Sequence, residues 1–63
     1  MQQDGHLTPD QLAERWHITR SSLAQQRYLG TGPRYLKVGR RVLYPLDSVV
    51  EFERANTVEP GAA

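Results

Sequence analysis

Residues 7–30 read LTPDQLAERWHITRSSLAQQRYLG, and this stretch decides the fold. It opens with a start signal for a helix: Thr8 is a typical N-cap residue, Pro9 suits the first helical position, and Gln11 completes a capping box with Thr8. Apolar residues then recur at helical spacing along one stripe. Leu7, just before the N-cap, is placed to pack against Leu12, the first residue of this stripe. The stripe consists of Leu12, Ala13 and Trp16. The sequence therefore predicts a helix from residue 9 that turns this stripe to the core.

A second helix is expected after a short turn. His17 should leave the first helix in a left-handed conformation, in which His is enriched among non-glycine residues. Thr19 then caps a helix over residues 20–29, which ends at Gly30. Two helices separated by about three residues fit a helix-turn-helix unit, whose second helix enters a groove of DNA.

A β-hairpin is expected around Gly39 and Arg40, because β-branched and aromatic residues flank this pair. A two-residue turn pairs Val38 with Arg41, and Gly39 at the first loop position suits it. A three-residue turn pairs Val38 with Val42. We favour the three-residue turn because it gathers four apolar residues on one buried face. These are Leu36, Val38, Val42 and Tyr44.

The remaining chain predicts a third helix capped by Asp47. Its inward residues should be Val49, Val50 and Phe52, and its outward residues Glu51, Glu53 and Arg54. The domain then spans residues 7–55, between a flexible N-terminus (1–6) and a flexible C-terminal tail (56–63). The expected fold is mainly helical with a small β-hairpin, in the order helix, helix, strand, strand, helix.

Length and composition narrow the function. A chain of 63 residues without cysteine holds one domain, and packing alone must stabilise it. His6 and His17 lack neighbouring ligand residues, so we expect no metal. We predict no enzyme, cofactor or small-molecule ligand, because no nucleophile–base set, inward carboxylate pair or phosphate-binding glycine loop appears. No membrane-spanning run or signal peptide is evident, so a cytoplasmic location is expected.

The charges are segregated along the chain. Residues 15–41 hold seven of the eight Lys and Arg residues and none of the seven acids. A basic middle flanked by acidic ends favours an anionic partner, because clustered Arg and Lys displace its counterions. Together with the helix-turn-helix pattern, this predicts binding to double-stranded DNA.

Candidate DNA-binding residues fall on two elements. On the second helix, Ser21 and Gln25 suit base edges, and Arg20 suits guanine or phosphate. Thr19 and Ser22 are further candidates for DNA contact. Their hydroxyls can instead cap backbone groups at the start of the helix, and we favour this capping role for Ser22. Tyr28 either stacks on a sugar or packs against the hairpin.

The hairpin tip supplies the second set. Lys37, Arg40 and Arg41 should project from a rigid support toward phosphates or an adjacent minor groove, as a wing does. A basic turn that only protects a sheet edge is the alternative. Arg27 and Arg34 are either phosphate contacts or solvated residues.

The runs LTPDQLAERWHITRSSLA and GTGPRYLKVGRRVLY together resemble small excisionases and related regulators with MerR-like and AlpA-like winged helix-turn-helix domains. The match covers residues 7–52. Ala13, His17 and Leu23 reproduce the helix-turn-helix frame, and the glycine-rich and basic segments reproduce the wing. Two residues depart from the family pattern: His17 replaces the usual glycine, and Gln26 stands where a large apolar residue is common.

The resemblance implies a recombination directionality factor of a phage or integrated element, in the nucleoid of a bacterial host. It would bind and bend repeated attachment-site DNA in several cooperating copies and direct an integrase toward excision. A single module covers only about 600 to 1,000 Å² of DNA interface, which independently favours such cooperation. The alternatives are a small transcriptional regulator at a promoter and a protein-interaction module without DNA binding.

Overall fold

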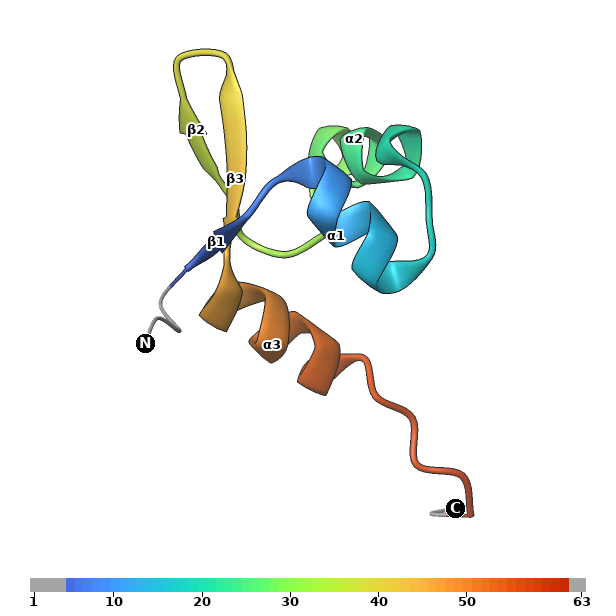
Figure 1. Ribbon diagram of the computed structural model, residues 1–63. Helices are drawn as coiled ribbons and strands as arrows, with labels where there is room; N and C mark the ends of the chain where they lie inside the picture. The colour runs from blue at the N-terminus through green and yellow to red at the C-terminus, as the bar shows by residue number, and fades with distance from the viewer. Residues whose placement is uncertain (1–4, 62–63) are drawn as a thin grey trace.

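The computed structural model describes residues 5–61, which form three helices and a three-stranded antiparallel sheet (Figure 1). The order is β1 (His6–Leu7), α1 (Pro9–Trp16), α2 (Arg20–Leu29), β2 (Leu36–Val38), β3 (Arg41–Pro45) and α3 (Leu46–Ala55). The expected order of helices and hairpin strands is thus present, with one additional strand at the start. The architecture is mixed α/β.

The start and end of α1 follow from local chemistry. The Thr8 hydroxyl accepts from the Gln11 backbone at 3.1 Å, and the Gln11 side chain accepts from the Thr8 backbone at 2.9 Å. This confirms the predicted capping box. His17 ends the helix at φ 58° and ψ 43°, which confirms its left-handed conformation.

The second helix also begins and ends as the sequence predicts. Thr19 caps α2 by accepting from the Ser22 backbone at 3.0 Å. At the other end Gly30 adopts φ 73°, a conformation that glycine reaches without a steric penalty. The first two helices are therefore joined by residues 17–19 alone.

The hairpin register differs from the one we favoured. Val38 pairs with Arg41 and Lys37 pairs with Val42, so the loop has two residues, Gly39 and Arg40. Gly39 has φ 61°, as the first position of a type II′ turn requires. The three-residue prediction was wrong because it relied on burial of β2 side chains, and β2 contributes nothing to the buried core.

The corrected register exchanges the two faces of β2. Leu36 and Val38 are 40% and 56% exposed. They lie on one face of the hairpin, and Val42 and Tyr44 lie on the other face. Lys37 lies on the same face as Val42, where we expected it outside. It remains exposed because the hairpin extends beyond the helices (Figure 1).

The strand β1 was not predicted. His6 and Leu7 pair with Pro45 and Tyr44, and the Leu46 backbone donates to the Gly5 carbonyl at 2.9 Å. Residues 5 and 6, expected in the flexible N-terminus of residues 1–6, therefore contact the end of β3 and the start of α3. Residues 1–4 lie outside the described part of the chain. At the other end, residues 56–61 are exposed, and the Thr57 hydroxyl donates to the Glu53 carbonyl at 2.7 Å.

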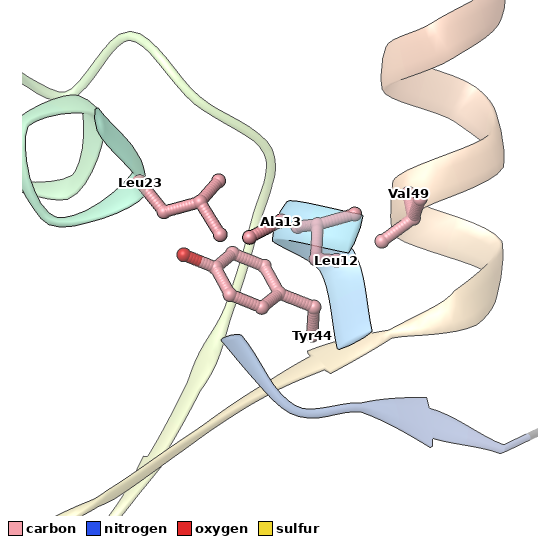
Figure 2. Packing of buried hydrophobic residues seen from close by; sticks show 5 residues of the cluster. All are labelled: Leu12, Ala13, Leu23, Tyr44 and Val49. Atoms are coloured by element: carbon pink, nitrogen blue, oxygen red, sulfur yellow. The ribbon is translucent and has the colours of Figure 1, made fainter. Parts of the chain in front are cut away.

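Five residues from four elements form the core (Figure 2). These are Leu12 and Ala13 of α1, Leu23 of α2, Tyr44 of β3 and Val49 of α3. Figure 2 shows the Tyr44 ring beneath the α1 side chains, with Val49 pointing toward Leu12 from the other side. The core thus fixes the first two helices against β3, and so positions the base of the hairpin.

The third helix begins earlier than expected and presents a different face. Pro45 is its N-cap without a side-chain hydrogen bond, so Asp47 lies in the first turn and does not cap it. Val50 is 36% exposed, where we expected it inward. Glu53 turns toward α1, where we expected it outward. Within residues 5–61, no helix is long and apolar enough to cross a membrane.

Candidate nucleic-acid interface

An open cleft of about 530 Å³ separates α2 from the hairpin. Four of the described residues that line the cleft are arginines, and no described lining residue is acidic. Its lining consists of Thr8, Pro9, Arg20, Ser21, Ala24, Arg27, Arg40, Arg41, Val42 and Leu43. The cleft therefore concentrates positive charge between a helix and a strand.

One wall of the cleft is formed by a single face of α2. Arg20, Ala24 and Arg27 recur every three or four residues along α2, so they share the helix face that looks across to β3. Ser21 extends this face at the start of the helix. The opposite wall comes from the turn and β3, through Arg40 and Arg41. Residues far apart in the sequence thus meet around one cleft.

The outer surface of α2 carries the remaining candidates on that helix. Ser22, Gln25 and Tyr28 are exposed, and none of them lines the cleft. Tyr28 is 89% exposed, so it does not pack against the hairpin. Thr19 is engaged in capping α2, and its hydroxyl also donates to the Ser22 hydroxyl at 3.1 Å. Gln25 is the exposed candidate whose amide suits a base edge.

Arg20 has an acidic neighbour that sequence reasoning missed. Its Nε lies 3.1 Å from a carboxylate oxygen of Asp10, in the first turn of α1. Both side chains are more than 70% exposed, so the pair adds little to stability. The contact places one carboxylate beside an arginine of the cleft.

Arg27 is held more firmly than the other arginines of the cleft. Its Nη1 donates to the Tyr44 hydroxyl at 2.6 Å, and its guanidinium lies over the Tyr35 ring at 5.8 Å. From the sequence, Arg27 was predicted to be either a phosphate contact or a solvated residue. The local sequence pattern does not indicate the bond between Arg27 and Tyr44. It predicts that the Tyr44 ring is in the core, and it names no partner for the Tyr44 hydroxyl.

The hairpin tip presents its cations to solvent. Lys37, Arg40 and Arg41 are all exposed, and two of them line the cleft. Arg34 lies elsewhere: it borders a groove against α3, beside Gly32 and Phe52. Arg34 does not line the cleft, but it shares a second hollow with Arg27 and Tyr35.

The opposite side of the molecule carries paired charges. Glu53 accepts from Arg15 at 2.7 and 2.9 Å and from the Trp16 ring nitrogen at 2.6 Å. Hydrogen bonds from Arg15 and Trp16 lower the pKa of Glu53 to about 2. Trp16 also stacks on Phe52, with ring centroids 5.5 Å apart. This junction ties α1 to α3.

The exposed side of α3 is apolar and acidic. Leu46 and Val50 border a shallow depression there together with Asp47, Glu51 and Arg54. Across residues 5–61, no group of three or more histidine or acidic side chains is arranged to hold a metal ion.

Comparison of the chain with known protein families, with curated proteins and with solved structures gave no match. The resemblance to excisionases therefore rests on the residues quoted above.

Proposed function

We propose that the protein binds double-stranded DNA as a winged helix-turn-helix domain, with α2 as recognition helix and the β2–β3 hairpin as wing. The cleft lined by Arg20, Arg27, Arg40 and Arg41 carries this proposal. A DNA strand that runs between the major groove and the next minor groove must pass between a recognition helix and its wing. Arg20 on one wall and Arg40 and Arg41 on the other are placed to bind its phosphates.

Base reading is assigned to α2. A helix of about 10 to 12 Å diameter fits a major groove about 12 Å wide. Ser21 and the exposed Gln25 then face base edges, and Gln binds adenine through two hydrogen bonds. Arg20, beside Asp10, reaches either guanine or phosphate.

Two sets of variants test this division. Changing Arg40 and Arg41 to alanine should weaken binding to any labelled duplex by more than about tenfold in fluorescence anisotropy. Gln25→Ala should instead reduce mainly the preference for the best site over mixed sequence. Arg54→Ala removes one positive charge on α3, outside the cleft, and measures the effect of net charge per arginine lost. Unchanged binding in both sets would contradict the proposed surface.

We further propose that this DNA binding serves excision, with attachment-site repeats as target, an integrase as partner and several copies side by side. The support is the sequence resemblance and the exposed apolar and acidic side of α3. That side carries Leu46, Asp47, Val50, Glu51 and Arg54. None of these residues lines the basic cleft, so that side is free for protein contacts on DNA.

An excision assay with integrase and paired attachment sites tests the finer proposal. Adding the protein should favour excision over integration. If recombination direction stays the same while promoter DNA is bound and transcription changes, the protein is a transcriptional regulator. If it is retained on DNA weakly and without salt dependence, it is a protein-interaction module.

A further inference from the structure

Arg27 joins α2 to β3 and to the residue that precedes β2. It donates to the Tyr44 hydroxyl on β3, and it lies over the ring of Tyr35, which precedes β2. The two tyrosine rings are tilted against each other, with centroids 6.1 Å apart. One guanidinium therefore contacts β3 and the start of the segment that leads into β2.

The link is built from a buried partner. Tyr44 is 1% exposed, and Figure 2 shows its hydroxyl pointing toward α2, beside Leu23. A hydroxyl buried in this way is destabilising unless it is hydrogen-bonded, and Arg27 provides the bond. A bond from a charged donor is stronger than a neutral one. The helix and the strand are thus coupled at a defined point.

We propose that Arg27 is a positioning residue, which sets the placement of the hairpin relative to α2 so that both engage one DNA duplex. This inference rests on the proposed DNA binding. It assigns Arg27 a role through Tyr44 and Tyr35, in place of a direct phosphate contact. Holding two contact elements in the bound arrangement strengthens binding because less freedom is lost on association.

A double-mutant cycle tests this role. Tyr44→Phe removes the hydroxyl that Arg27 binds and leaves every positive charge in place. Its affinity for a fluorescein-labelled mixed-sequence duplex is measured in the native chain and in the variant with Arg40→Ala and Arg41→Ala. Circular dichroism confirms that each variant is folded at the assay temperature.

The positioning role predicts strong coupling. Tyr44→Phe should weaken binding about tenfold when the wing cations are present and less than about twofold when they are absent. A loss of equal size in both backgrounds would mean that the hydroxyl only stabilises the fold, and it would overturn the proposal.

Arg27 itself is tested by the salt dependence of binding. The logarithm of affinity falls with the logarithm of salt concentration, and the slope of this line should be the same for Arg27→Met and Tyr44→Phe. The effect of losing one positive charge is measured in Arg54→Met and subtracted from the Arg27→Met slope first. A slope lower by about one unit in Arg27→Met would show that Arg27 contacts a phosphate, and it would overturn the proposal. Arg27→Lys, which keeps a donor and a cation over Tyr35, should restore most of the affinity.

The two proposals fail in different ways. If the native chain does not bind DNA, the proposed function is wrong and the positioning role is lost with it. If the native chain binds but the cycle is additive, only the positioning role is wrong.

Discussion

The α1–α3 junction and the α2–hairpin cleft use charge in opposite ways. At the junction, Glu53 accepts hydrogen bonds from both Arg15 and Trp16, so its charge is matched within the fold. At the cleft, four arginines gather without an acidic lining residue. The contact of Arg20 with Asp10 lies at its mouth and is largely exposed.

This difference separates charges that hold the fold from charges left for a partner. Arginines that face one another across a cleft repel. Arg27 also supports the fold through its bond to Tyr44, whereas Arg40 and Arg41 form no ion pair within residues 5–61. An anionic partner removes that repulsion. Variants at the junction should therefore change stability alone, and variants at Arg40 and Arg41 should change DNA binding alone.

The largest stability effect is expected at the junction. Glu53→Gln should lower the free energy of unfolding by about 1 kcal/mol, because a charge-assisted pair is lost at a half-exposed site. For a domain of this size the melting temperature should fall by about 4 to 8 °C. Thermal unfolding followed by circular dichroism measures it, with Glu51→Gln on the same helix as control. A loss of DNA affinity at a temperature where the variant is folded would break the separation.

The junction should also make the free energy of unfolding depend on pH. The pKa of Glu53 is lowered to about 2, so its contribution is complete above pH 4.5, the ordinary value, and is lost as the pH falls toward 2. Urea unfolding of the native chain and Glu53→Gln across this range measures it. The difference between the two proteins should shrink as the pH falls, and a constant difference would contradict the assignment.

Sequence reasoning predicted the helices because their ends depend on local chemistry. Thr8, Thr19 and Gly30 each cap a helix through neighbours a few residues away. It failed where distant packing decides. β1 has two residues, too few for a periodic signal, and it forms because β3 offers a free edge. Glu53 turns inward because Arg15 and Trp16 lie opposite.

The candidate site was predicted in part for the same reason. The basic residues of α2 and the hairpin were found from charge and spacing, and the structure brings four of them to one cleft. The hairpin register was missed because turn geometry at Gly39 decides it, with Leu36 and Val38 left exposed. The links of Arg27 to Tyr44 and of Arg20 to Asp10 depend on tertiary contacts that no local pattern records.

An effect of similar size and opposite sign is expected at Gln26, which lies at neither region. Its Oε1 is buried without a hydrogen-bond partner among the described residues, against Gly32. Gln26→Met keeps the shape and removes the unpaired acceptor, so it should stabilise the protein by about 1 kcal/mol. Urea unfolding measures the change. The exposed neighbour Gln25→Met is the control, and an equal gain in both variants would argue against this explanation.

The smallest effect is expected at His17, which ends α1 at φ 58°. Glycine relieves the left-handed strain but has more freedom when unfolded, so His17→Gly should stabilise by about 0.5 kcal/mol. His17→Val should destabilise by about 1 kcal/mol, because a branched residue fits this conformation poorly. Thermal unfolding of both variants tests the order, and a reversed order would contradict it.

The salt dependence of DNA binding tests the central claim most directly. Affinity of the native chain for a labelled duplex is measured by anisotropy over a series of salt concentrations, alongside the variant with Arg40→Ala and Arg41→Ala. The logarithm of affinity should fall linearly with the logarithm of salt, and the double variant should flatten that slope by about two units. Binding that is absent, insensitive to salt, or of equal slope in both proteins would contradict the assignment of the arginine cleft to DNA.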